Sequence, residues 1–256
     1  MLFVATESAM FHLTGTTLTD PDNNGLFQDL GDHLLASAIA AVQSRGAFHL
    51  ALSGGSTPKP FYVSLATDPK FSEFPWHQTH VWIVDERRVP NDSSSSNFRM
   101  ISESLADVPG TNRPQLHEIQ AMASDPAGEY ESELRKEFQL NGDKPPQLDF
   151  VLLGMGDDCH TASLFPNTDA LQESNRWIVV NDGPNVTPPD RVTMTYPLLN
   201  AARQIAILCL GAKKHEALKR VASLDEPDLL NVPISGIRPT SGNLTWYLDE
   251  AAAGDD

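Results

Sequence analysis

Some segments of the chain have apolar residues at a helical spacing, and others have short, mostly apolar runs. Between Leu26 and Ser44 apolar residues recur every three to four residues, which predicts an amphipathic helix, and Gly46 follows as a stop signal. Four mostly apolar runs are short enough to be buried strands: residues 47–52, 81–84, 148–153 and 204–210. The pattern predicts further helices at about 59–66 and 213–221, and a further strand at 191–195.

Strands that alternate with helices in this way are typical of an α/β fold, with a mainly parallel sheet flanked by helices. The chain shows neither an internal repeat nor a clear linker, so residues 1–256 are predicted to form a single domain. In such sheets, ligands bind beyond the carboxyl ends of the strands. Three of the four strand ends carry polar clusters and the fourth precedes Lys213 and Lys214, which predicts one site at this edge.

Charge and composition exclude several classes of partner. The chain has 18 basic and 34 acidic residues, a formal net charge of −16, which disfavours binding to nucleic acid and to anionic membranes. No apolar run approaches the length of a membrane span, and no Lys or Arg precedes Arg45, so a secretory signal is not indicated. Two cysteines outside any CxxC pair disfavour both a disulfide scaffold and a thiolate zinc site. We therefore expect a cytoplasmic protein.

The segment SGGSTP follows the first predicted strand. Its paired glycines, Gly54 and Gly55, let backbone N–H groups approach an anion, while Ser56 and Thr57 add hydroxyl donors at the start of the next helix. A phosphate loop is one interpretation of this pattern. The other is a simple turn from strand to helix, since neither GxxxxGK[ST] nor GxGxxG is present.

Two basic clusters could supply the charge that an anionic substrate needs. Asp85, Glu86 and Arg87 end the second strand, where Arg87 could grip a phosphate and Asp85 could orient a base; the alternative is a self-neutralising surface turn. Lys213 and Lys214 open a predicted helix, where the helix dipole disfavours cations. This placement suggests a nearby anion, although exposed lysines are common on helices.

The segment GMGDDCHTASLFP carries the main candidate for catalysis. His160 lies in a predicted loop after two aspartates, and an imidazole of ordinary basicity can take a proton from water near neutral pH. Asp158 could orient this ring. A metal site is disfavoured, because adjacent residues such as Asp157 and Cys159 rarely converge on one ion. The other histidines show no paired spacing, which is typical of structural or solvated roles.

Seven segments together resemble the 6-phosphogluconolactonase family. They are LSGGSTPKPFY, WIVDERRVP, SNFRM, LLGMGDDCHTASLFP, RVTMTYPLLNAAR, LGAKKHEAL and RPTSGNLTWYLDEAA, in order from about residue 50 onward. The resemblance implies a NagB/RpiA-like fold and hydrolysis of 6-phosphoglucono-δ-lactone in the oxidative pentose phosphate pathway. It implies no metal and no organic cofactor. A sister family, glucosamine-6-phosphate deaminase, typically has HIAFNEP and a DEY-type motif where this chain has HTASLFP and DERRVP.

The resemblance also implies roles for individual residues. His160 matches the general base, and Asp158 and Asp85 match acidic residues that orient or tune it. The residues that match the phosphate and substrate contacts are Gly54, Gly55, Ser56, Thr57, Arg87, Lys214 and, more weakly, Arg191. The partner is thus expected to be a small sugar-phosphate lactone, and no motif indicates an oligomeric state. Deaminase or isomerase activity and a non-catalytic sugar-phosphate sensor are the alternatives.

Cys159 stands where the family usually has glycine. If this position has a positive φ, a cysteine there introduces strain of roughly 1–3 kcal/mol, whereas a negative φ makes the replacement harmless. Cys159 could alternatively act as a nucleophile that forms a thioester with the lactone. His160 already supplies a sufficient route, so the histidine mechanism is the preferred interpretation.

Overall fold

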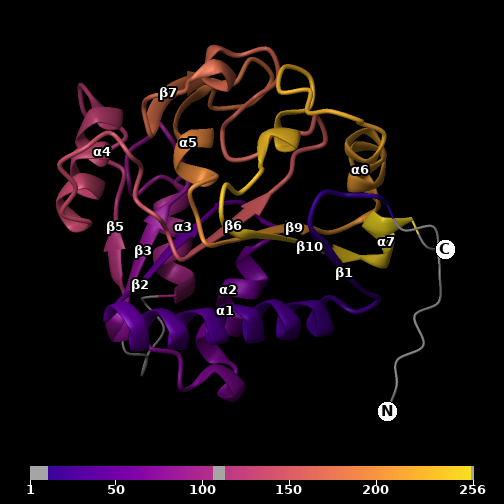
Figure 1. Ribbon diagram of the computed structural model, residues 1–256, viewed down its shortest axis with the longest axis horizontal. Helices are drawn as coiled ribbons and strands as arrows, with labels where there is room; N and C mark the ends of the chain where they lie inside the picture. The colour runs from indigo at the N-terminus through magenta and orange to yellow at the C-terminus, as the bar shows by residue number, and fades with distance from the viewer. Residues whose placement is uncertain (1–10, 106–112, 255–256) are drawn as a thin grey trace.

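A seven-stranded sheet forms the centre of the molecule in the computed structural model, which describes residues 11–105 and 113–254 (Figure 1). Every pair of neighbouring strands in this sheet is parallel. The strand order across the sheet is β1 (Thr16–Asp20), β10 (Asn243–Asp249), β9 (Gln204–Cys209), β6 (Phe150–Gly154), β2 (Phe48–Leu52), β3 (Thr79–Ile83) and β5 (Gln115–His117). The predicted α/β fold with a mainly parallel sheet is confirmed.

A smaller antiparallel sheet lies beside the large one. Its strands are β4 (Asp85–Arg87), β8 (Asp190–Met194) and β7 (Ile178–Asp182), in that order. β4 follows β3 almost directly, and the N–H of Met194 bonds to the carbonyl of Val84 at 2.9 Å, which joins the two sheets. The polar cluster at 85–87 is thus a strand of its own rather than a simple strand end, because β8 offers it a partner that no local pattern reveals.

Helices cover both sides of the large sheet. In Figure 1, α1 (Asn23–Arg45) and α2 (Lys59–Thr67) lie below the sheet, whereas α5 (Tyr196–Leu199) and the small sheet lie above it. The other helices are α3 (Asn97–Leu105), α4 (Pro126–Glu137), α6 (His215–Ala222) and α7 (Glu250–Ala253). Short 3₁₀ turns are η1 (Pro69–Phe71), η2 (Trp76–Gln78), η3 (Asp169–Gln172), η4 (Ala212–Lys214) and η5 (Pro233–Gly236).

The long helix α1 begins three residues before the predicted start at Leu26 and ends where the sequence predicts. Asp22 caps its first turn by accepting the N–H of Asn24 at 3.0 Å, and Gly46 ends it in the left-handed conformation with φ of 83°. The N–H of Gly46 bonds back to the carbonyl of Val42 at 2.9 Å. The predicted stop at Gly46 is confirmed, and only a glycine adopts this φ without strain. The helix predicted at 213–221 instead opens with η4 before α6 begins.

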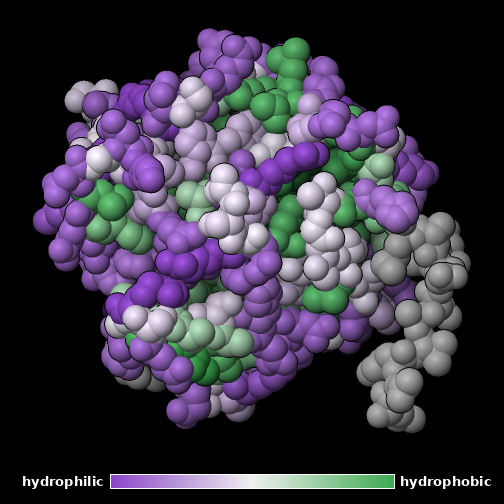
Figure 2. Space-filling model, in the orientation of Figure 1, coloured by the Kyte–Doolittle hydropathy of each residue, from purple (hydrophilic) through white to green (hydrophobic). Residues whose placement is uncertain are grey.

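The core lies between the large sheet and the helices. The central strands read as mostly apolar runs because both of their faces are buried, and Phe48, Trp82 and Phe150 are among the fully buried side chains. Hydrophilic residues cover most of the face seen in Figure 2, with small hydrophobic areas between them. Within the described residues, no helix combines the length and the apolar character needed to cross a membrane.

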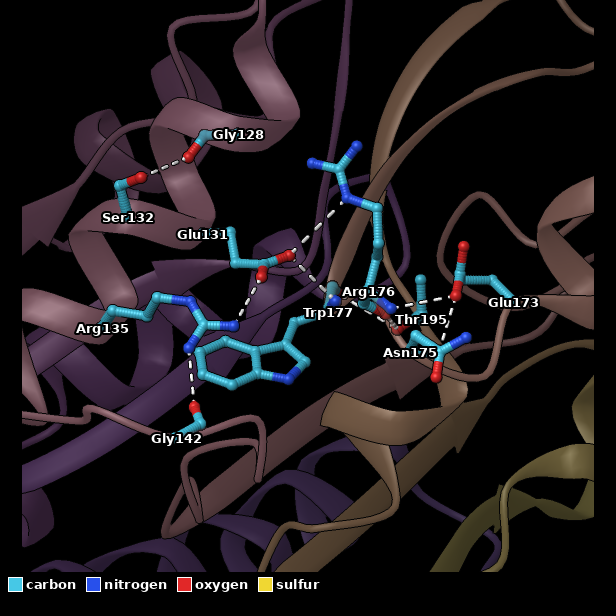
Figure 3. A network of polar contacts seen from close by, with 10 residues as sticks. All are labelled: Gly128, Glu131, Ser132, Arg135, Gly142, Glu173, Asn175, Arg176, Trp177 and Thr195. Carbon is cyan, nitrogen blue, oxygen red and sulfur yellow. Dashed lines mark hydrogen bonds and ion pairs between the residues drawn. The ribbon is translucent and has the colours of Figure 1, made fainter.

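A polar network fixes α4 against the chain that enters β7 (Figure 3). The carboxylate of Glu131 accepts hydrogen bonds from Arg135 and from the backbone N–H of Trp177, each at 3.0 Å. The guanidinium of Arg135 stacks 3.9 Å from the centre of the buried Trp177 ring. Because Glu131 is itself largely buried, these contacts hold α4 in one position beside β3 and β5.

Candidate active site

A cleft of about 250 Å³ opens beyond the carboxyl ends of the central strands. The loops after β2, β6 and β9 contribute to it, as does β4 after β3, so the predicted convergence of the strand ends is confirmed. The sequence candidates that line the cleft are Gly54, Gly55, Ser56, Thr57, Asp85, Arg87, His160 and Lys214. Asp158 lies behind His160, and Arg191 is not among the lining residues.

The glycine loop turns the chain from β2 into α2. Gly55 has a φ of 108°, a conformation that side chains with a Cβ rarely adopt. A Cβ on Gly54 would overlap the amide of Asn97, which approaches the loop from the start of α3. The loop therefore exposes backbone close to the first turn of α2, where free N–H groups and the helix dipole favour an anion.

Asn97 fastens this loop to β4, and it is a residue of the site that sequence analysis did not single out. Its side-chain amide donates to the carbonyl of Asp85 at 2.7 Å, and its amide oxygen accepts a hydrogen bond from Arg87. The Arg87 guanidinium also donates to the carbonyl of Ser95 at 3.0 Å. The only sequence signal for Asn97 was its presence in the SNFRM segment. Asn97 holds the Arg87 guanidinium at the cleft.

Successive side chains of β4 point to opposite faces of the small sheet, so its three residues have two different roles. Asp85 and Arg87 face the cleft, whereas the carboxylate of Glu86 accepts the N–H groups of Asn97 at 2.7 Å and Phe98 at 2.8 Å. Burial raises the pKa of Glu86, while these hydrogen bonds oppose the shift. Glu86 thus anchors the first turn of α3 and leaves the substrate side to its neighbours.

His160 is oriented by a carboxylate two residues before it. Nδ1 of His160 lies 2.5 Å from Oδ1 of Asp158, and the backbone N–H of His160 bonds to the same oxygen at 3.1 Å. Burial alone would raise the pKa of Asp158, but the hydrogen bond and charge of His160 lower it below its usual value. The ionised Asp158 thus holds the proton of the imidazole on Nδ1, so Nε2 is the nitrogen with a free lone pair.

Asp85 connects β4 to the histidine loop. Its carboxylate is buried and accepts a hydrogen bond from Ser163 Oγ at 2.7 Å, while the N–H of Ser163 bonds to Thr193 Oγ1 at 3.1 Å. Gly156 lies under the ring of His160, where a Cβ would overlap both the imidazole and the Asp158 carboxylate. The loop that carries His160 is therefore held from both sheets.

Cys159 has a φ of 66°, so the condition for backbone strain at this position is met. Its side chain is fully buried, and Sγ points toward the carbonyl of Ala217 at a distance of 3.7 Å. Burial also raises the pKa of the thiol. The thiol lies on the far side of the loop from the cleft and is protonated at neutral pH, which contradicts a role as nucleophile.

The structure separates the two lysines and buries Arg191. Lys214 lines the cleft and lies 2.5 Å from Asp157, whereas Lys213 is exposed. Arg191 pairs with Arg87 in the register of β4 and β8, but it is buried and donates to the carbonyls of Pro188 and Asp190. Arg191 thus lies on the same face of the small sheet as Arg87, with its guanidinium 5.9 Å from the centre of the Phe165 ring, but it is not among the residues that line the cleft.

A family model described as glucosamine-6-phosphate isomerases/6-phosphogluconolactonase matches residues 21–246 of this chain. The chain belongs to this family. A 6-phosphogluconolactonase of Nostoc sp. is 39% identical over 238 residues, which cover 92% of this chain and 95% of that protein. A 6-phosphogluconolactonase of Synechocystis sp. is 40% identical over 215 residues, with 83% and 86% covered.

Solved structures of family members have the same fold. A crystal structure of 6-phosphogluconolactonase from Leishmania guyanensis is 28% identical, with a TM-score of 0.79, and the match covers 94% of this chain and 98% of that one. The parallel sheet flanked by helices is thus the NagB/RpiA-like fold that the motifs implied. The family also includes the glucosamine-6-phosphate isomerases, so membership alone does not select between the two reactions.

Proposed function

We propose that the protein hydrolyses 6-phosphoglucono-δ-lactone to 6-phosphogluconate, the second step of the oxidative pentose phosphate pathway. The observation that carries the proposal is the ion pair of His160 with Asp158 in a cleft that also contains Arg87, Lys214 and the glycine loop. A base beside groups that can bind an anion suits a phosphorylated ester as substrate: the basic groups bind its phosphate, and the base activates the water that attacks the ester. The relatives named 6-phosphogluconolactonase, 39% and 40% identical, support the same reaction.

In the proposed mechanism, Nε2 of His160 removes a proton from a water molecule. The water oxygen then bonds to the lactone carbonyl carbon, and the carbonyl oxygen takes up negative charge. Collapse of this intermediate breaks the bond between the carbonyl carbon and the ring oxygen. The ring oxygen receives the proton held by His160 and leaves as a hydroxyl group. Asp158 stabilises the imidazolium that forms between these two steps.

The phosphate defines the position of the substrate in this proposal. Gly54, Gly55, Ser56 and Thr57 supply backbone and hydroxyl donors at the start of α2, and Arg87 and Lys214 supply positive charge from the other walls. Asp85 lines the same cleft as His160, where its carboxylate could accept a sugar hydroxyl in addition to the hydrogen bond from Ser163. Water attack on an ester requires only a base and oxyanion donors, so the reaction needs no cofactor.

A direct assay separates this proposal from its alternatives. Purified wild type and His160→Ala are supplied with freshly made lactone, and acid release is followed after subtraction of spontaneous hydrolysis. Removal of the base should reduce the rate by about 10²–10⁴-fold. Ammonia from glucosamine 6-phosphate would instead support the deaminase, and binding of 6-phosphogluconate without either reaction would support a sensor. A His160→Ala variant within about threefold of wild type would overturn the role of His160.

The proposal extends to the domain organisation of the protein, its location in the cell and its partners. Residues 1–256 would form one catalytic domain located in the cytoplasm. The net charge of −16 supports a partner set limited to small molecules, without nucleic acid or membranes. For Arg191 we propose support of Arg87 rather than direct contact with the substrate, because its guanidinium is bound to backbone carbonyls.

A further inference from the structure

Two histidines and a glutamate from three different elements meet at the end of the large sheet near α4. His80 lies on β3, His117 ends β5, and Glu137 ends α4. Nδ1 of His80 lies 3.0 Å from Nε2 of His117 and 3.4 Å from Oε1 of Glu137. One ligand atom from each of the three residues falls within 4.8 Å of the other two. In Figure 1, α4 and β5 lie next to each other at this side of the molecule.

Two of the three separations between these atoms are close to those around a tetrahedral ion. Zinc holds nitrogen and oxygen ligands at about 2.0–2.2 Å, which places any two of them roughly 3.3–3.5 Å apart. The contacts of 3.0 and 3.4 Å made by His80 Nδ1 are already close to this spacing. The rings of His80 and His117 are nearly parallel, with an interplanar angle of 13°. To receive the ion, the two rings must turn relative to each other so that both nitrogen lone pairs point at it, while the nitrogens stay about as far apart as they are.

The surroundings of His117 favour the ligand form of its ring. Nδ1 of His117 bonds to Oε1 of Glu133 at 2.6 Å, so the ring proton is held on Nδ1 and the lone pair of Nε2 points at His80. A carboxylate that bonds to the far nitrogen of a histidine in this way orients metal-binding histidines and increases their basicity. The ring of His117 also stacks on Trp82, 3.6 Å between centres, which fixes its plane.

Hydrogen bonding accounts for only part of this arrangement. The lone pair of His117 Nε2 can accept a hydrogen bond from the N–H of His80 Nδ1. The same N–H cannot also make a good hydrogen bond to the Glu137 carboxylate, since it has only one proton for two acceptors. A divalent cation in place of the proton satisfies both acceptors and His80 Nδ1 at once. His49 is close by, but its Nδ1 already accepts from Trp82 Nε1 at 3.2 Å, so it is not a ligand.

Solvent can reach this cluster, and the cluster is separate from the cleft. His117 is buried, whereas the side chain of Glu137 is 32% exposed, which leaves a path for an ion and a position for a water ligand. His80 is the second residue of β3, near the amino end of that strand, whereas the cleft opens beyond its carboxyl end. The two sites therefore lie toward opposite ends of the strand.

We propose that His80, His117 and Glu137 bind Zn²⁺ and so join β3 and β5 to α4. Two imidazole nitrogens and one carboxylate favour Zn²⁺ over Mg²⁺ and Ca²⁺, which take oxygen ligands. The ion would add to the Glu131 network, which also fixes α4 (Figure 3). Its role would be structural, and it takes no part in the reaction proposed for the cleft.

The test is a titration of the metal-free full chain with Co²⁺, a spectroscopic substitute for Zn²⁺, followed by displacement with Zn²⁺. We expect one equivalent of Co²⁺ to produce tetrahedral d–d absorption that Zn²⁺ removes. Zn²⁺ at 100 times its Kd should raise the Tm by about 5 °C. Because His160 and Asp158 could also bind a cation, the titration is repeated in His160→Ala, where the signal should remain.

Variants on α4 assign the ligands without disturbing the core. Glu137→Gln should weaken Zn²⁺ binding at least about tenfold and Glu133→Gln by about 10-fold to 100-fold, whereas Glu129→Gln, an exposed position on the same helix, should leave it unchanged. His80→Gln provides a second ligand variant if His117→Gln does not fold. Equal affinity in wild type, Glu137→Gln and His80→Gln, or no tetrahedral Co²⁺ signal in wild type, would overturn the proposal.

Discussion

Oδ1 of Asp158 binds two hydrogen-bond donors of His160, the ring Nδ1 at 2.5 Å and the backbone N–H at 3.1 Å. The aspartate therefore fixes the ring relative to the main chain that carries it, within a single turn. This local arrangement needs no distant residue to orient the ring. The opposite nitrogen is then directed by the loop itself, and the loop is fixed by Gly156 beneath the ring.

Replacement of Asp158 by asparagine should impair the chemical step more than binding. An amide can present its NH₂ group to Nδ1 and reverse the tautomer, and it cannot stabilise an imidazolium, so kcat should fall by about 10–1000-fold. KM should stay within about threefold. Asp157→Asn is the matched control, because Asp157 contacts Lys214 instead of the histidine. A kcat in Asp158→Asn equal to that of the control would show that the pair is only structural.

The two adjacent lysines provide a sharp test of phosphate binding. Lys214→Ala should raise KM for the lactone about tenfold or more with little change in kcat, because a phosphate is bound alike in the ground and transition states. Arg87→Ala should act in the same direction. Lys213→Ala removes an equal charge from an exposed side chain next to Lys214 and should leave both constants unchanged. Equal effects of the two lysine variants would point to a general electrostatic effect of the surface.

The left-handed backbone at position 159 gives a prediction about stability. Cys159→Gly relieves the strain of a φ of 66° but loses a buried thiol, whereas Cys159→Ala loses the thiol and keeps the strain. The glycine variant should therefore be more stable than the alanine variant by about 1 kcal/mol in urea unfolding. Both variants should keep lactonase activity within about threefold. Loss of activity in both would restore the thioester mechanism.

Cys209 makes stability fall at alkaline pH. Burial raises its pKa to about 12, from a reference value of 9.0. Below pH 9 the thiol is protonated in both states and has no effect on the pH dependence. Above pH 9 the unfolded chain loses the proton while the folded chain keeps it, so this group lowers the free energy of unfolding by roughly 1.4 kcal/mol per pH unit.

The measurement for Cys209 is urea unfolding of wild type and Cys209→Ala at pH 7.5, 9 and 10.5. Between the last two values, wild type should lose about 1–2 kcal/mol more of its unfolding free energy than the variant. Tyrosines of the unfolded chain also lose protons in this range, whereas burial raises the pKa of Tyr62 and Tyr130 in the folded protein; these groups are common to both proteins and cancel in the difference. Parallel curves for the two proteins would show that Cys209 ionises equally in the folded and unfolded states.

Local signals in the sequence predicted helices α1, α2 and α6 and the strands β2, β3, β6 and β9, because the causes of these elements are local. The spacing from Leu26 to Ser44 and the glycine at 46 are sufficient for α1 and its end, and mostly apolar runs are sufficient for strands buried on both faces. The edge strands β1 and β5, the interior strand β10, the small-sheet strands β4 and β7, and helices α3, α4, α5 and α7 were not predicted. β5 has only three residues, and α4 has a polar surface whose position depends on contacts with Trp177.

The residues of the site also divide into those that local motifs mark and those that only contacts in the folded chain reveal. His160, the glycine loop and the basic clusters were found because motifs mark them, and their meeting at one edge follows from parallel strands. Asn97 was missed because its importance lies in bonds to Asp85 and Arg87, ten or more residues away. His80 and His117 were assigned structural or solvated roles because they lie 37 residues apart in sequence, and only the pairing of β3 with β5 brings them together.

The pairing of β1 with β10 sets the order in which the molecule can be completed. Thr16 lies opposite Thr245 and Asp20 opposite Asp249, so the outermost strand depends on a partner made more than 200 residues later. During synthesis on a ribosome, β1 therefore stays without its partner until β10 has been made. Such distant pairing slows folding and exposes an open sheet edge to other chains. A nascent chain halted before residue 243 is thus the form most in need of a chaperone.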